Sequence, residues 1–190
     1  GTFGPVNASL WFLEASQVAN GYSLNLSAKA GPVNVDFTHS EMDYDSTNQV
    51  ASLANDEATL TKIIVSGAAA GVNLVAGYGM TNDTVARNHG VDLTADNDAK
   101  TNFRLDQIVL DDHNDADALL LGASMTFGAT TVGANYLIAK VNAPTAGTVD
   151  TDATELDLTV AYAMSKNFSI TGLYSTSSID DNTAGTNDVE

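Results

Sequence analysis

The chain has 190 residues, 44% of them hydrophobic, so it is long enough to form one sizeable domain. Its 24 acidic residues outnumber 7 basic ones, and the formal net charge of -17 opposes a nucleic-acid partner, because such binding depends on Lys and Arg neutralising phosphates. The sequence contains no cysteine, which excludes a disulfide framework and any metal or cofactor held by thiolates.

Apolar and polar residues alternate over most of the chain, with the period of two that is typical of strands whose two faces meet different surroundings. This pattern predicts an all-β protein without a competing amphipathic helix. Each predicted strand is close to the length with which a tilted strand crosses a bilayer. The ten predicted strands are Val6–Ala15, Gly21–Ala30, Val33–Glu41, Ala58–Gly67, Gly71–Met80, Asn102–Leu110, Ala118–Phe127, Thr130–Val141, Ala153–Ala163 and Asn167–Ser177.

Two windows of about 20 residues without a charge, 63–82 and 118–139, have the length that a membrane-spanning helix needs. Each is interrupted near its middle by a glycine-containing turn, "SGAAAG" in the first and "FGAT" in the second. Apolar residues recur with period two on both sides of these turns. Each window therefore predicts a hairpin of two strands.

The links between the predicted strands differ in length in a regular way. "AGP", "SGAAAG", "FGAT" and "MSKN" are short, whereas the links after Glu41, Met80, Val141 and Ser177 are long, polar and acidic. Short turns at one end and long loops at the other are typical of an antiparallel up-and-down transmembrane β-barrel. A soluble β-sandwich built from the same strands is the open alternative.

Several segments resemble the campylobacter-type (epsilonproteobacterial) major outer-membrane porins. The first is "LWFLEASQVANGYSLNLSAKAGPVNVDFTHSEMDYDS", in which a Trp-bearing strand leads through a Gln-Val-Ala segment into a Tyr-containing strand, a tight turn and a strand ending in an acidic loop. Later hairpins of that family are similar to "VSGAAAGVNLVAGYGMTND", "LLLGASMTFGATTVGANYLIAK" and "VAYAMSKNFSITGLYSTSSIDDNTAGTND".

The resemblance implies that residues 1–190 are a single porin segment, the C-terminal half of a longer chain that closes an 18-stranded barrel. It also implies a homotrimer in the bacterial outer membrane, in contact with lipid bilayer and lipopolysaccharide. The expected function is a water-filled channel for passive diffusion of small hydrophilic solutes and ions, not an enzyme. The acidic composition predicts a weak preference for cations.

Polar positions on the alternating strands are the expected pore lining. Lys29 and Asp36 flank one short turn on the same predicted face, which suggests an ion pair near the periplasmic rim. Charges merely solvated on the exposed face of a soluble sheet would give the same pattern. The pore-lining candidates are Asn25, Lys29, Asn34, Asp36, Asp157 and Thr159.

The segment "DQIVLDDHNDAD" crowds carboxylates that could bind Ca²⁺ loosely, although no cofactor is otherwise expected. It does not match an EF-hand loop, because Ala116 stands at the glycine position and Gly122 at the final glutamate. A soluble, acidic, calcium-binding β-sandwich or adhesin domain at the cell surface is the alternative function. The weak metal-ligand candidates are Asp111, Asp112, Asp115 and Asp117.

Overall fold

The computed structural model describes residues 1–15, 19–44, 57–82, 115–142 and 150–181, with Phe103, Leu105, Ile108, Leu110 and His113. Regular structure in these residues consists of β-strands alone. They are β1 (Thr2–Phe3), β2 (Val6–Ala15), β3 (Ala19–Ala30), β4 (Val33–Tyr44), β5 (Glu57–Ala69), β6 (Val72–Thr81), β7 (Ala116–Phe127), β8 (Thr130–Val141), β9 (Thr151–Ser165) and β10 (Phe168–Asp181). The described part of the chain holds no helix with the length and hydrophobicity to cross a membrane.

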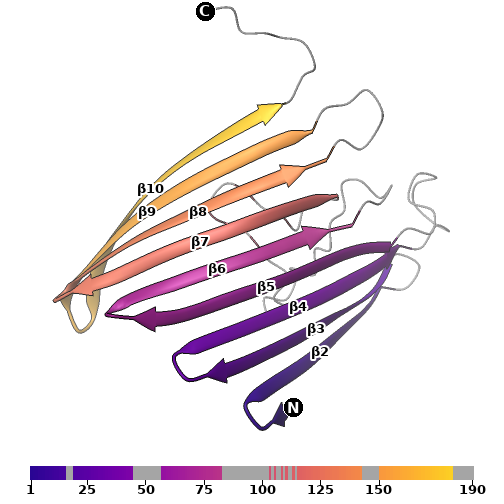
Figure 1. The fold of residues 1–190 in the computed structure, drawn as a ribbon, viewed down its shortest axis with the longest axis horizontal. Helices are drawn as coiled ribbons and strands as arrows, with labels where there is room; N and C mark the ends of the chain where they lie inside the picture. The colour runs from indigo at the N-terminus through magenta and orange to yellow at the C-terminus, as the bar shows by residue number, and fades with distance from the viewer. Residues whose placement is uncertain are drawn as a thin grey trace, which may run out of the picture.

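The strands form one sheet in which each pairs with its neighbours in chain order, and every pair is antiparallel. Figure 1 shows a single curved layer, with the N-terminal strands at one edge and β10 at the other. The antiparallel up-and-down order predicted from the loop lengths is therefore confirmed.

Two-residue turns join β3 to β4, β5 to β6, β7 to β8 and β9 to β10, all at the same end of the sheet (Figure 1). Ala70 and Gly71 both have positive φ, 52° and 81°, as a tight turn between twisted antiparallel strands requires. Because β5 continues to Ala69, most of the predicted link "SGAAAG" belongs to the strands. Longer connections lie at the opposite end, as expected.

The predicted strand Asn102–Leu110 is not found in the sheet: its described residues, Phe103, Leu105, Ile108 and Leu110, are not in a strand, and its other residues lie outside the described part of the chain. β6 pairs directly with β7, Gly79 opposite Ala118, so the sheet has no place for a strand between them. The segment instead folds back on itself, with Leu110 N donating to Phe103 O at 2.9 Å and Leu105 N donating to Ile108 O at 3.2 Å. Its alternating apolar residues pack against the sheet face instead of extending the sheet.

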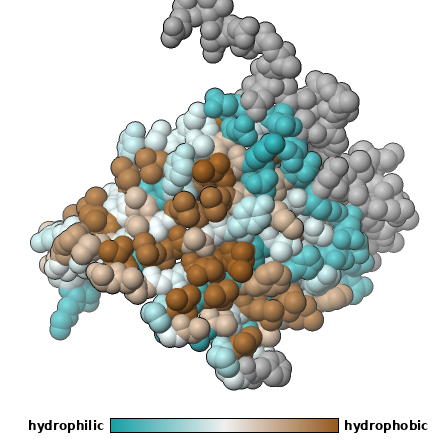
Figure 2. Space-filling view, viewed as in Figure 1, coloured by the Kyte–Doolittle hydropathy of each residue, from teal (hydrophilic) through white to brown (hydrophobic). Residues whose placement is uncertain are grey.

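One face of the sheet, here called the apolar face, carries large hydrophobic side chains that no second layer of described residues covers. Leu158 and Val160 are 42% and 51% exposed although they lie mid-strand. Figure 2 shows hydrophobic residues spread across the sheet and hydrophilic ones at the end of the long connections. The apolar face includes Leu10, Phe12, Ile63, Val65, Leu74, Tyr78, Leu119, Leu121, Tyr136, Ile138, Leu158 and Val160.

The opposite face, here called the polar face, contains the buried residues. Ser, Asn and Thr side chains dominate it on β3 and β4, whereas small apolar residues occupy it on β6 to β9 near the long connections. Phe103, Ile108 and Leu110 pack on these small residues and complete one hydrophobic cluster. The sheet therefore keeps its only described core on the polar face, and the apolar face needs an apolar medium to cover it.

Leu158→Arg tests whether lipid is that medium. We expect it to lower the free energy of unfolding of the protein in lipid vesicles by about 2–4 kcal/mol, that is, to destabilise it. The reason is that Leu158 lies mid-strand on the apolar face, where an arginine meets hydrocarbon. Denaturant titration of vesicle-folded protein measures this. The control Ala161→Arg places the same side chain on the polar face of β9, and equal losses in the two variants would contradict the assignment of faces.

Candidate pore lining

The polar face of β3 and β4 is held by side-chain hydrogen bonds across the strand pair. Thr38 Oγ1 donates to Asn25 Oδ1 at 2.9 Å, and Ser40 Oγ donates to Ser23 Oγ at 2.7 Å. These residues lie directly opposite each other in the register, so the short polar side chains reach without strain. These hydrogen bonds hold the side chains in place on the polar face, which is called the wall below.

All six predicted lining residues lie on the polar face. Asn25 and Asp157 are buried, Asn34, Asp36 and Thr159 are half-buried, and Lys29 is exposed. Lys29 lies opposite Asn34, and Asp36 lies opposite Ser27. The expected Lys29–Asp36 ion pair does not form in the described structure, because the register offsets the two residues by one cross-strand pair.

Two further charged residues on this face escaped the sequence analysis. Lys62 is 6% exposed and lies between Thr38 of β4 and Gly79 of β6, whereas Glu155 is fully buried on β9. Among the described side chains of the polar face, three carboxylates face two ammonium groups, which leaves one net negative charge. The five are Lys29, Asp36, Lys62, Glu155 and Asp157.

Phe103, Leu105, Ile108 and Leu110, here called the docked segment, pack on this wall where β6 carries glycine. A Cβ atom at Gly79 would lie 2.8 Å from Leu110 Cδ2 and 3.3 Å from the Phe103 ring, and one at Gly77 would lie 3.1 Å from that ring. The missing side chains therefore leave the space that Phe103 and Leu110 fill. Both are almost fully buried, at 2% and 1% exposure.

Glu155 ties the segment to the far side of the wall. Its Oε2 accepts a hydrogen bond from Ile108 N at 2.7 Å, and its Oε1 accepts one from Ser175 Oγ at 3.1 Å. A buried carboxylate with both oxygens accepting hydrogen bonds is a strong local anchor, since such charge-assisted bonds are about twice as strong as neutral ones. The only sequence signal for it was its period-two spacing from Asp157.

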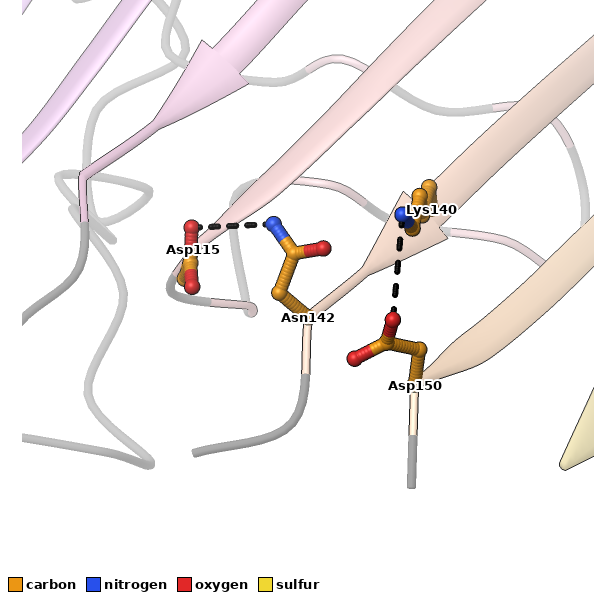
Figure 3. Close-up of polar contacts among 4 residues, drawn as sticks. All are labelled: Asp115, Lys140, Asn142 and Asp150. Atoms are coloured by element: carbon orange, nitrogen blue, oxygen red, sulfur yellow. Dashed lines mark hydrogen bonds and ion pairs between the residues drawn. The ribbon is translucent and has the colours of Figure 1, made fainter. Parts of the chain in front are cut away.

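The rim at the long connections is bound together by polar contacts between strand ends. Asn142 Nδ2 donates to Asp115 Oδ1 at 3.1 Å, and Lys140 Nζ lies 3.7 Å from Asp150 Oδ2 (Figure 3). Backbone bonds run in the same direction, from Asp115 N to Asn82 O at 2.8 Å and from Asn142 N to Asp115 O at 2.9 Å. These contacts fix the ends of β6, β7 and β8 relative to one another.

The structure describes two of the four predicted calcium ligands, Asp115 and Asp117, and engages them differently. Asp111 and Asp112 lie outside the described residues, Asp115 accepts the Asn142 amide, and Asp117 lies opposite Lys140 on the apolar face. A different acidic group does converge at the rim: the carboxylates of Glu41, Asp43 and Glu57 lie within 4.8 Å of one another. Crowded exposed carboxylates do not by themselves define a metal site, so calcium binding stays a prediction.

The comparisons with known proteins agree on one class. A family model described as Gram-negative porin matches residues 4–182. No curated protein sequence matches the chain.

Several solved structures share the fold of this chain. The chain is similar to OccK10 (OpdN) of Pseudomonas aeruginosa, with 12% identity and a TM-score of 0.68 over 95% of this chain and 54% of the other. It is similar to a BenF-like porin from Pseudomonas fluorescens Pf-5, with 15% identity and a TM-score of 0.69 over 93% and 47%. The chain therefore spans about half the length of these structures, and at such identities the likeness concerns the fold.

Gly79→Val tests how the segment is docked. The valine side chain would occupy the space of Leu110 Cδ2, so we expect Phe103 and Leu110 to leave the wall and the Leu110 amide to exchange its hydrogen at least about tenfold faster, the factor for 1.4 kcal/mol. Hydrogen exchange by mass spectrometry measures this. The control Ala76→Val lies on the apolar face of the same strand, and unchanged exchange in Gly79→Val would contradict the docking.

Proposed function

Because the chain belongs to the Gram-negative porin family, we propose that it forms part of the wall of a water-filled channel for passive diffusion of small hydrophilic solutes and ions. Its location is the bacterial outer membrane. The observation that carries the proposal is the division of one sheet into an uncovered apolar face and a polar face. Lipid covers the first in this proposal, and channel water covers the second.

The docked segment, Phe103, Leu105, Ile108 and Leu110, sets the width of the channel in this proposal. These four residues lie on the polar face and occupy space that water would otherwise fill, anchored by Gly77, Gly79 and Glu155. A constriction held by packing and a buried carboxylate keeps a defined size, so it selects solutes by width. Solutes are selected by the width of the channel and by its electrostatic field, and no chemical step takes place.

A weak preference for cations follows from the charges on the wall. The five charged side chains leave one net negative charge, and Lys62 offsets part of the field of Asp36 and Glu155. Acidic residues of the rim, such as Glu41, Asp43 and Glu57, add negative potential at the mouth. The small net charge of the wall supports a modest preference and not strict selectivity.

The soluble sandwich is the weaker reading of the same strands. It requires a second layer over the apolar face, and the described residues provide no such layer. Porins are channels, so membership of the porin family also supports a channel over an enzyme.

The cation preference is tested by paired charge variants on the wall. In planar bilayers with a tenfold KCl gradient, we expect a reversal potential of the cation sign for the native protein. Asp36→Asn should move it toward zero, and Lys29→Gln should move it further in the cation direction, because each changes the wall by one unit charge.

Asp180→Asn provides the control, since it removes the same charge from an exposed position at the end of β10. A native reversal potential of the anion sign, or shifts of equal size in Asp36→Asn and Asp180→Asn, would refute the proposed preference.

A homotrimer, contact with lipopolysaccharide and the campylobacter-type relationship are also proposals, supported by sequence resemblance. Electrophoresis in detergent without heating should show a band near three times the mass of the heated chain, because β-barrel porin trimers that bury apolar faces resist detergent. Intact-mass measurement of the heated chain is the control for size. A single unheated band at the monomer mass would exclude the trimer.

A further inference from the structure

A recess of about 450 Å³ hollows the polar face near the two-residue turns, a volume within the range of about 300–1,000 Å³ that is usual for small-molecule sites. Each strand from β4 to β9 contributes one polar side chain to the lining. None of the described lining residues is charged. The polar ones are Asn34, Ser66, Asn73, Ser124, Asn135 and Thr159.

The centre of the recess is bare backbone. Gly122 of β7 and Gly133 of β8 lie on the polar face of neighbouring strands, in successive cross-strand rows. A Cβ atom at Gly122 would collide with Asn135 Oδ1 and lie 2.6 Å from Val75 Cγ1, and one at Gly133 would lie 2.7 Å from Thr159 Oγ1. A carboxamide oxygen, a hydroxyl oxygen and an apolar side chain therefore edge a floor that has no side chain of its own.

The polar groups around this floor differ from those elsewhere on the wall because they are not bonded to one another. On β3 and β4, Thr38 donates to Asn25 and Ser40 donates to Ser23. None of the six polar side chains of the recess makes a side-chain hydrogen bond to another described residue. Five of them are half-buried and Asn73 is exposed, so their donors and acceptors are available to water or to a solute.

The chemistry of these groups matches that of an uncharged polyol. Carboxamide and hydroxyl side chains each both donate and accept hydrogen bonds, as every hydroxyl of a sugar does. A charged group in the recess would give up water without gaining an opposite charge, which is costly. The side chain of Val75 beside Gly122 offers apolar surface for the C–H groups of a sugar ring.

We propose that this recess is a binding subsite for an uncharged polyhydroxyl solute, such as a monosaccharide. The inference rests on the proposed channel function and adds a solute class to it. A few neutral hydrogen bonds hold a solute weakly, which is compatible with passage because a channel site must also release what it binds.

The charged groups of the wall stand outside this subsite. Lys29 lies opposite Asn34 and Asp157 lies opposite Asn135, but neither is among the residues that line the recess. The Oδ1 atom of Asp157 is buried, so it does not face a solute there. Cation preference and polyol binding therefore depend on different side chains and should respond to different substitutions.

The test is block of potassium current by glucose in planar bilayers. We expect the current through the native protein to fall with added glucose and to reach a plateau, as binding to a site requires. Asn135→Leu keeps the approximate side-chain size but removes the carboxamide, so we expect the half-blocking glucose concentration to rise about three- to tenfold, in keeping with the loss of one or two neutral hydrogen bonds.

Ser124→Ala is a milder variant with a matched control. It removes one hydroxyl from the lining, and we expect the half-blocking glucose concentration to rise about two- to fivefold. Ser27→Ala makes the same change on the polar face of β3, opposite Asp36 and outside the recess, and should leave that concentration unchanged. Electrophoresis in detergent with and without heating shows that each variant is folded.

Sugars of similar size and different charge test the solute class. Protonated glucosamine carries a positive charge and glucuronate a negative one, whereas glucose carries none. We expect both charged sugars to need higher half-blocking concentrations than glucose, because the described lining offers no opposite charge to either.

A current that falls in simple proportion to glucose concentration, the effect of viscosity alone, would overturn the inference. Equal half-blocking concentrations in the native protein, Asn135→Leu and Ser124→Ala would also overturn it, as would stronger block by either charged sugar. If ion current flows while glucose gives no saturable block, the subsite fails and the channel proposal stands. Absence of any ion current would refute the channel and the subsite together.

Discussion

The organising constraint in this protein is that a one-layer sheet has two faces and the period of a strand assigns each side chain to one of them. Every strand from β2 to β10 pairs with its neighbour in chain order, so a residue's face follows from its position in the register alone. A shift of one residue in any pair would move hydrophobic side chains such as Leu158 to the polar face. The tight turns, with Ala70 and Gly71 in the left-handed region, hold that register.

The polar face is not uniform, and its variation organises the channel wall. On β3 and β4 short hydroxyl and amide side chains hydrogen-bond to each other. On β6 the glycines at positions 77 and 79 remove side chains altogether, which admits the aromatic ring of Phe103. Nearer the turns, Gly122 and Gly133 line a recess of about 450 Å³ on the same face. The same residue type thus makes room for a segment in one place and for solvent or solute in another.

The electrostatics of the wall depend on which carboxylates are already paired. Glu155 accepts hydrogen bonds from Ile108 and Ser175, so its charge is used to hold the segment. Asp157, one row away, has a buried oxygen that accepts none from the described residues. Most of the net charge of the chain lies away from this wall, in the rim and the connections, which explains how a strongly acidic sequence can line a nearly balanced face.

The sequence alone determined nine of the ten predicted strands to within four residues at either end, the up-and-down order and the faces of all six predicted lining residues, because period-two alternation and loop lengths are local properties. It could not determine that Phe103, Leu105, Ile108 and Leu110 pack on the sheet face, since alternation of apolar residues is the same whether they face a neighbouring strand or the face of a sheet. Tertiary structure alone decided the pairing of Glu155 with Ile108, the docking of Phe103 over Gly77 and Gly79, and the separation of Lys29 from Asp36. The first two depend on contacts between residues far apart in the chain, which no local pattern encodes, whereas the third follows from the register that the two-residue turn sets between β3 and β4.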